Sequence, residues 1–348
     1  MALHVLREVA SSIRNGVFFS ILADECTDIS NKEQLTLCIR WIDEKLEPHE
    51  EFIGFYHIPN IKADTIVAVI KDAVMGMNLS LSNCRGQCYD AGGPMAGSRR
   101  GVAQQILSEA PKAHPTHCHG HALNLAVCDA TKSSKLLSDA LDITYELCKL
   151  IKFSPKRQGL LDQIKADINL EAAGLKVICP TRLTVRGQSF DRMIKNYEAL
   201  LMEWDACLKD RLDTAMRARI IGVKSQMEKF EYFFALHLGV KVYSMTDNLS
   251  KTLQQSSMSA AQGQRNAKNN GRSPRQEALG RCDQKFGKLY EDVLQKSTEL
   301  GLSGPQLPRH RRTPKRFEVG SGEGSFPSSP KEYYKRQYFG VGSCYCRY

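Results

Sequence analysis

The sequence has 348 residues, 42% of them hydrophobic and 25% charged, which is the usual composition of a globular chain with a buried core. This length allows two or three domains, or one large domain with an insertion. No stretch approaches the roughly 20 consecutive apolar residues of a membrane span, and the N-terminus lacks the basic and apolar regions of a secretory signal. Twelve cysteines stand singly, mostly in apolar segments, as expected of a reduced cytosolic or nuclear protein.

The net charge of +10 is concentrated in one part of the chain. Residues 1–250 hold 30 Lys+Arg and 30 Asp+Glu, whereas residues 251–316 hold 14 Lys+Arg against 5 Asp+Glu. A basic excess of this kind suits contact with nucleic-acid phosphates. A solvated basic linker explains the same charge equally well, so both interpretations stay open at this point.

The first 133 residues alternate between strand and helix patterns. Apolar residues at helical spacing or in strict alternation predict the following elements: a helix over 1–15, strands over 17–24, 34–43 and 51–58, a helix over 62–75, a strand over 81–89, a helix over 98–110, a short strand over 115–119 and a helix that begins near 121. Short turns favour an antiparallel meander for the first three strands. The later crossovers then predict a mixed α/β sheet with helices on its faces, in the order of the ribonuclease-H-like fold.

Acidic side chains follow two of these strands. Asp24 ends the first strand and Asp90 the fourth, and these two strands are neighbours in that fold. Two adjacent carboxylates repel each other unless a cation lies between them, so the sequence predicts a shared Mg²⁺ or Mn²⁺ site. The alternative for the stretch Val17–Ser30 is a surface loop whose acids are simply solvated. We assign supporting or solvated roles to Glu25 and Asp28.

Helical patterns replace strands from residue 134 onward. They include one helix over 190–208 and a last partial helix over 332–339. The expected division of the chain is a ribonuclease-H-like core at 1–133, a helical insertion domain at 134–255, a basic flexible linker at 256–274, a helical continuation at 275–300 and a low-order basic, Gly/Ser/Pro-rich tail at 301–348.

Five potential zinc ligands lie within eight residues: His114, His117, Cys118, His119 and His121. Structural zinc sites usually draw on two separated ligand pairs, and the second pair would have to be Cys84 and Cys88. We favour the alternative in which packing fixes Cys118 and His121 at a strand-to-helix turn, with His121 near the acidic site. Zinc is therefore not expected.

Several stretches resemble known sequences, in the same order along the chain. They are ILADECTDISNKEQLTLCIRWID, CRGQCYDAGGPMAGSRRGVAQQI, THCHGHALNLAV, TRLTVRGQSFDRMIKNYEALL and RRTPKRFEVGSGEGSFPSSPKEYYKRQYF. These blocks are similar to the core of hAT-superfamily transposases, as found in zinc finger MYM-type protein 1-like and TTF-type zinc-finger-containing proteins. The resemblance extends over nearly the whole chain, to about Phe339.

The resemblance implies a ribonuclease-H-like core interrupted by a large all-α insertion, which cuts DNA with two metal ions and an Asp-Asp-Glu triad. Asp24 and Asp90 fall on the first two acids of that triad, and Cys118 and His121 fall on the family's Cys-x-x-His pair. Water would attack the scissile phosphate while metal ions stabilise the attacking and leaving oxygens.

The sequence also departs from the family's pattern. The family's third acid lies in a C-terminal block after the insertion, and this sequence ends before that block. The tryptophan of the family's Thr-Arg-Trp motif is Leu183 here, after Arg182. With two acids and no third, we expect an inactive, degenerate site that binds Mg²⁺ or Mn²⁺ weakly.

The expected function is that of a transposon-derived nuclear or nucleo-cytoplasmic protein. It would bind DNA non-specifically or assemble with full-length relatives, with no membrane partner and no small-molecule substrate. The alternative is a metal-dependent strand transferase or nuclease completed by an unrecognised acid or a partner chain. The residues expected to contact nucleic acid are basic: Arg182, Arg309, Arg311, Arg312, Lys315 and Arg316.

Overall fold

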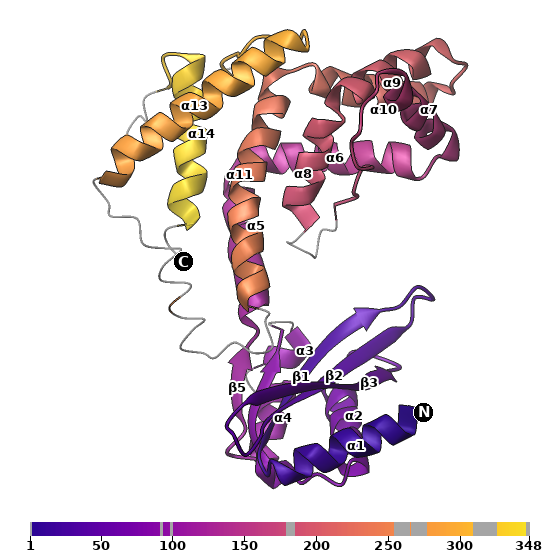
Figure 1. Ribbon diagram of the computed structural model, residues 1–348, viewed down its shortest axis with the longest axis vertical. Helices are drawn as coiled ribbons and strands as arrows, with labels where there is room; N and C mark the ends of the chain where they lie inside the picture. The colour runs from indigo at the N-terminus through magenta and orange to yellow at the C-terminus, as the bar shows by residue number, and fades with distance from the viewer. Residues whose placement is uncertain are drawn as a thin grey trace, which may run out of the picture. The chain divides into compact units, whose positions relative to one another are not determined.

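The structure is a computed structural model that describes residues 2–90, 93–97, 100–178, 185–253, 265, 277–308 and 326–345. The chain forms two compact units, shown in Figure 1. Unit 1 comprises residues 1–123 and 251–265, and unit 2 comprises residues 124–250 and 266–348. The division falls inside helices α5 (His119–Ser133) and α11 (Phe230–Leu253), which therefore contribute to both units.

Unit 1 is built on a five-stranded mixed sheet. Its elements are α1 (Ala2–Asn15), β1 (Phe19–Thr27), β2 (Glu33–Ile42), β3 (Pro48–His57), α2 (Ala63–Gly76), β4 (Cys84–Tyr89), α3 (Gly93–Ala96), α4 (Val102–Glu109) and β5 (His114–His117). The strand order is β3-β2-β1-β4-β5. The first three strands pair antiparallel, and β1–β4 and β4–β5 pair parallel. The predicted mixed sheet, with β1 beside β4, is confirmed.

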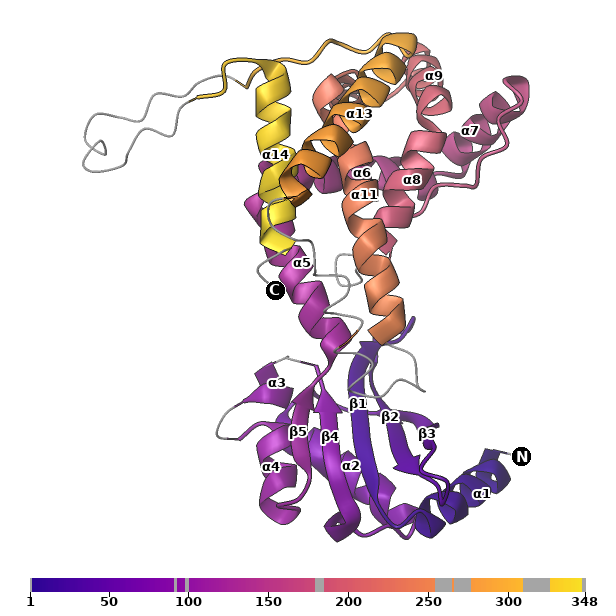
Figure 2. The same ribbon diagram turned by 60° about the vertical axis from the view of Figure 1, so that its left-hand side comes forward.

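One face of this sheet carries the core of unit 1. Alternate side chains of β1 and β2 are buried with side chains of helices α1, α2 and α4. Figure 2 shows these helices beside the sheet. The strand residues concerned are Phe19, Ile21, Ala23, Leu35, Leu37 and Ile39. Each large aliphatic side chain buried in this way stabilises the fold by about 1.5–3 kcal/mol. The alternate positions on the opposite face include half-buried and exposed polar groups, and Asp24 is one of them.

A shift of register in β4 decides which of its side chains reach that opposite face. Phe19 pairs with Cys84, but the next residue, Ser20, pairs with Gly86. Arg85 is therefore an extra residue in β4 that has no pairing partner on β1. Paired residues on neighbouring strands share a face. Cys84 therefore lies in the core with Phe19, whereas Cys88 lies on the opposite face with Leu22. The hypothesis that Cys84 and Cys88 form one ligand pair is wrong for this reason.

The regular elements of unit 2 are helices in the part of it that the structure describes. Besides its shares of α5 and α11, it contains α6 (Lys135–Lys152), α7 (Pro155–Asp167), α8 (Arg186–Lys195), α9 (Tyr197–Lys209), α10 (Thr214–Met227), α13 (Glu277–Glu299) and α14 (Pro330–Tyr345). The single helix expected over 190–208 is divided at Asn196. The buried side-chain amide of Asn196 donates to the carbonyl oxygens of Arg192 at 2.7 Å and Ala173 at 3.1 Å, and this competes with the regular helical pattern.

The C-terminal helix α14 is longer and better packed than the sequence suggested. Tyr334 is 1% exposed, and its ring lies 5.1 Å from that of Phe230 and 4.8 Å from that of Phe234, both on α11. Tyr290 of α13 joins the same cluster, with its ring centre 6.1 Å from that of Tyr334. The prediction of a low-order tail over 301–348 is therefore corrected for residues 330–345. Aromatic partners on α11 and α13 stabilise a segment whose own pattern is weak.

Candidate functional site at the ends of β1 and β4

Asp24 and Asp90 lie at the same edge of the sheet. The last parallel pair between β1 and β4 joins Leu22 to Cys88. Asp24 follows two residues after Leu22 within β1, and Asp90 follows two residues after Cys88, directly beyond the end of β4. Because the side-chain period of a strand is two residues, both aspartates continue the face of Leu22 and Cys88. Asp24 is exposed and Asp90 is half-buried. Two acids that are 66 positions apart in the sequence are thus brought together by strand pairing.

A third carboxyl group lies beside them. Glu25 pairs with Leu35 on β2, which places it at the end of the core face. Burial raises the pKa of Glu25, and the negative charges of Asp90, Glu33 and Asp24 raise it further. Its Oε1 atom is buried and has no hydrogen-bond partner. The sequence interpretation gave Glu25 only a supporting or solvated role, because it paired Asp24 with Asp90 at the matching strand end.

Asp28 has a local structural role. Its carboxylate accepts hydrogen bonds from the backbone N–H groups of Ser30 at 2.8 Å and Lys32 at 3.0 Å, and from Gln34 Nε2 at 3.1 Å. These bonds hold the turn between β1 and β2 and lower the pKa of Asp28. Asp28 therefore fixes the strand pairing that carries Asp24 and lies outside the acidic site itself.

The acidic edge has the chemistry of a weak site for a hard divalent cation. Mg²⁺ is commonly held by one or two carboxylates and several waters, and Asp24 and Asp90 can supply such a pair. Burial first, and then the negative charges of Asp90, Glu33 and Asp24, raise the pKa of Glu25, so a cation at this edge would offset the mutual repulsion of these acids. Within the described ranges, however, no three or more His, Cys, Asp or Glu side chains gather in a full metal-ligand set. These residues fit a water-rich magnesium or manganese site better than a protein-enclosed one.

The Cys-x-x-His pair begins helix α5. Cys118 is the first residue after β5. Its backbone N–H donates to the carbonyl oxygen of Tyr89 at 3.0 Å, and its own carbonyl oxygen accepts from the backbone N–H of Ala122 at 2.9 Å. Cys118 directly precedes α5 and so lies at the N-terminus of this helix. His121 is half-buried in the first turn. Both residues thus lie at the strand-to-helix turn where packing was expected to fix them.

Comparison with known proteins agrees with this geometry. Residues 1–101 match the family described as ZMYM1/FAM200, RNase-like domain. This stretch of the chain is thus similar to an RNase-like domain. The ZMYM1/FAM200 RNase-like domain thus includes both Asp24 and Asp90, and the resemblance to transposase-derived proteins is confirmed.

Two curated relatives extend the match beyond the RNase-like domain. The human 52 kDa repressor of the inhibitor of the protein kinase is 28% identical over 260 residues, and its mouse counterpart is 27% identical over 261 residues. Each alignment covers 72% of this chain and 34% of the relative. The chain therefore spans about a third of the length of these relatives, and it is similar to a protein that is named as a repressor.

The predicted nucleic-acid contacts lie outside the described residues. They are the six basic residues Arg182, Arg309, Arg311, Arg312, Lys315 and Arg316. In contrast to the RNase-like domain, these contacts thus remain predictions from the sequence. Among the helices that the structure describes, none is both long and apolar enough to span a membrane.

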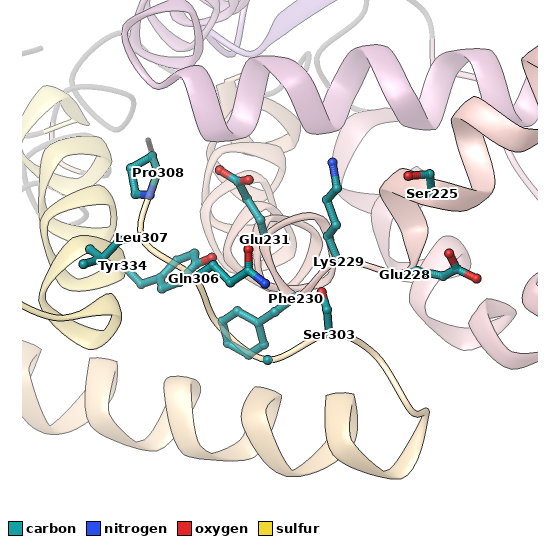
Figure 3. A pocket seen from close by; sticks show the side chains of 11 residues that line it. Ser225, Glu228, Lys229, Phe230, Glu231, Ser303, Gln306, Leu307, Pro308 and Tyr334 are labelled. Carbon is teal, nitrogen blue, oxygen red and sulfur yellow. The ribbon is translucent and has the colours of Figure 1, made fainter. Parts of the chain in front are cut away.

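Unit 2 contains a pocket of about 460 Å³ that is far in sequence from the acidic edge. Figure 3 shows the side chains of Phe230, Lys229 and Glu231 around it. Glu228, also in its lining, pairs with the ammonium group of Lys224 at 3.1 Å. The lining contains neither His nor Cys and gathers opposite charges around the start of α11. We assign no chemistry to this pocket.

Proposed function

We propose that this chain is a hAT-type, transposase-derived DNA-binding protein whose acidic edge holds a divalent cation weakly and does not cut DNA by itself. The observation that carries the proposal is the parallel register of β1 and β4, which aligns Asp24 with Asp90. The match to the RNase-like family and similarity to a named repressor support a regulatory, nuclear role over catalysis.

The metal part of the proposal assigns each acid a separate task. Asp24 and Asp90 would hold Mg²⁺ or Mn²⁺, and Glu25 would balance the charge of the bound cation from the core side of the edge. A cation bound there supplies positive charge that can neutralise a phosphate oxygen of a nucleic acid. The described residues hold two aligned aspartates and one neighbouring glutamate.

Isothermal titration with Mn²⁺ tests the site. We expect weak binding to the wild-type chain and at least about a tenfold loss of affinity in the Asp24→Asn/Asp90→Asn double variant, because both ligands lose their charge. Asp72→Asn is the matched control, since Asp72 is an exposed acid on α2. Equal Mn²⁺ affinity of the wild type and the double variant would refute the metal site.

A second candidate function is a nuclease in which Glu25 serves as the third acid. Its proximity to Asp90, its raised pKa and its unpartnered oxygen favour this alternative. Plasmid nicking in the presence of Mn²⁺ separates the two functions. Our proposal expects no nicking by the purified chain. Nicking that is lost in Asp24→Asn and in Glu25→Gln, but kept in Asp72→Asn, would establish the nuclease instead.

A further inference from the structure

Strand β3 forms one edge of the sheet of unit 1. Among the strands that the structure describes, β3 pairs with β2 alone, and both views of the ribbon show it at the outer side of the sheet (Figures 1 and 2). An edge strand of ten residues presents a row of backbone N–H and C=O groups that another strand can pair with. This edge can therefore accept an added strand.

Hydrogen bonds to β2 show which residues of β3 turn their backbone groups outward. In an antiparallel strand these groups point alternately to one side and the other. The N–H of Ile58 donates to Glu33 O at 3.0 Å, and at the other end of the strand Glu47 O accepts from the N–H of Asp43 at 3.1 Å. Ile53 is an extra residue between the two halves, because the pairing with β2 shifts there. Counting from both ends gives the outward-facing residues of β3: Glu50, Phe52, Phe55 and His57.

The side chains of these four residues are exposed and share the face of the sheet opposite the core. Phe52 pairs with Cys38 and Phe55 with Thr36, which are alternate residues of β2. The two phenylalanines are 55% and 63% exposed, and their ring centres are 5.0 Å apart. Natural edge strands are usually protected by charged side chains, so two neighbouring exposed rings favour an edge that becomes covered.

The outward-facing residues are arranged symmetrically along β3. Residues 50 and 57 are equidistant from the midpoint between Ile53 and Gly54, and so are residues 52 and 55. A second copy related by a two-fold axis at this midpoint would therefore place Glu50 opposite His57 and Phe52 opposite Phe55, twice each. Every one of these pairs joins two outward-facing residues. A shift of this antiparallel pairing by two residues in either direction sets a phenylalanine opposite Ile53 or Gly54 and breaks both aromatic pairs.

We propose that β3 pairs antiparallel with β3 of a second copy of this chain, in the register that joins Glu50 to His57 and Phe52 to Phe55. The four phenylalanine rings then pack together on one face of the joined sheets, and each Glu50 carboxylate accepts a hydrogen bond from the imidazole of His57 in the other copy. Aromatic pairs and pairs of an acid with a base are the cross-strand combinations that stabilise a sheet. The two-fold symmetry closes the assembly, because it leaves neither β3 edge free.

Sedimentation velocity of the full chain in reducing buffer tests the pairing, at concentrations from about 2 to about 200 μM. We expect the average mass to rise with concentration from 39.0 kDa toward twice that value. Phe52→Ser/Phe55→Ser should weaken dimerisation at least about tenfold, because all four rings are lost from the interface. Phe153→Ser is the matched control, since Phe153 is 74% exposed at the end of α6, and it should dimerise like the wild type. Far-ultraviolet circular dichroism checks that each variant is folded.

Two further sets of variants test the register. When Phe52→Cys and Phe55→Cys chains are mixed and mildly oxidised, residue 52 of one chain should form a disulfide with residue 55 of the other, because the Cα atoms of such a pair are about 5.5 Å apart. Either variant alone should not link at its new position, since equivalent residues would be offset by roughly 10 Å along the strands. Peptide mass mapping distinguishes this disulfide from links through native cysteines.

Glu50→Lys should weaken dimerisation roughly two- to tenfold, because the lost pair occurs twice in the interface. Adding His57→Glu to this variant should restore dimerisation by exchanging the two charges. A wild-type chain that stays monomeric at about 200 μM overturns the proposal. So does a dimer that is equally stable in Phe52→Ser/Phe55→Ser, which would mean that the copies meet through another surface.

Discussion

The buried side chain of Glu203 makes the stability of unit 2 depend on pH. Glu203 is 0% exposed on α9, and neither of its carboxylate oxygens has a hydrogen-bond partner. Burial raises its pKa from 4.5 to about 8, although the charge of Arg157 opposes the rise. The folded state therefore favours the protonated carboxyl group of Glu203. The contribution of this group to the free energy of unfolding is complete below pH 4.5 and is lost as the pH rises through about 8. Between pH 5 and pH 8 we expect the wild type to lose roughly 3–4 kcal/mol relative to Glu203→Gln.

Urea unfolding at several pH values measures this difference. Glu198→Gln is the control, because Glu198 is an exposed acid on the same helix, and its difference from the wild type should stay nearly constant with pH. A Glu203→Gln curve that runs parallel to the wild-type curve from pH 5 to pH 8 would mean that Glu203 remains ionised in the folded state.

The joint between α1 and the sheet depends on one glycine. A Cβ atom on Gly16 would lie 2.6 Å from the Trp41 ring and 2.8 Å from the carbonyl oxygen of Ile42. The backbone oxygen cannot turn away as a flexible side chain could, so either α1 or β2 must move. We expect Gly16→Ala to lower the free energy of unfolding by about 1–3 kcal/mol, as overpacked core positions do.

Gly76→Ala is the matched control for this glycine. Gly76 ends α2, and a Cβ atom there would meet nothing within 4 Å. Because alanine favours helix, this substitution should leave stability unchanged or raise it by up to about 1 kcal/mol. Thermal denaturation of the two variants compares them directly, and equal melting temperatures would argue against a close approach at Gly16.

The aromatic face of α14 is a second feature at the scale of elements. Tyr334→Ala removes a buried ring that contacts both α11 and α13, and we expect a loss of about 3–5 kcal/mol in the free energy of unfolding. Arg336→Ala on the same helix removes an exposed ion pair with Glu332 and should change stability little. Chemical denaturation monitored by tyrosine fluorescence measures both variants, and similar midpoints would show that α14 does not stabilise unit 2.

These elements also show how much could be predicted from the sequence. Alternating and helical periodicity located β1, β2 and β3 and the order of the sheet, because one face of each element is buried. The extra residue at Arg85 was not predictable, since a shift of pairing in a six-residue strand leaves no periodic signal. The placement of Glu25 depends on tertiary geometry, namely its pairing with Leu35 on β2. The role of α14 was missed because its partners lie on α11 and α13.

At the scale of the whole molecule, the positive charge is separated from the acidic edge along the chain. Residues 251–316 hold 14 Lys+Arg against 5 Asp+Glu, whereas residues 1–250 are balanced. If this excess contacts DNA, each neutralised phosphate contributes about −0.9 to the slope of log affinity against log salt. Replacing Arg309, Arg311, Arg312, Lys315 and Arg316 with Gln should therefore reduce the slope by roughly 3–5. Fluorescence anisotropy with a labelled duplex between low and moderate salt measures it.

A variant with the same net charge tests whether the position of the charge matters. Five exposed lysines outside the basic segment can be replaced with Gln instead: Lys45, Lys112, Lys132, Lys195 and Lys209. Counterion release depends on phosphates contacted and only weakly on total charge, so this variant should keep most of the wild-type slope. Equal slopes for the two variants would show that DNA responds to net charge alone. The proposal of a DNA-contacting basic segment would then fail, while the metal site at Asp24 and Asp90 would be unaffected.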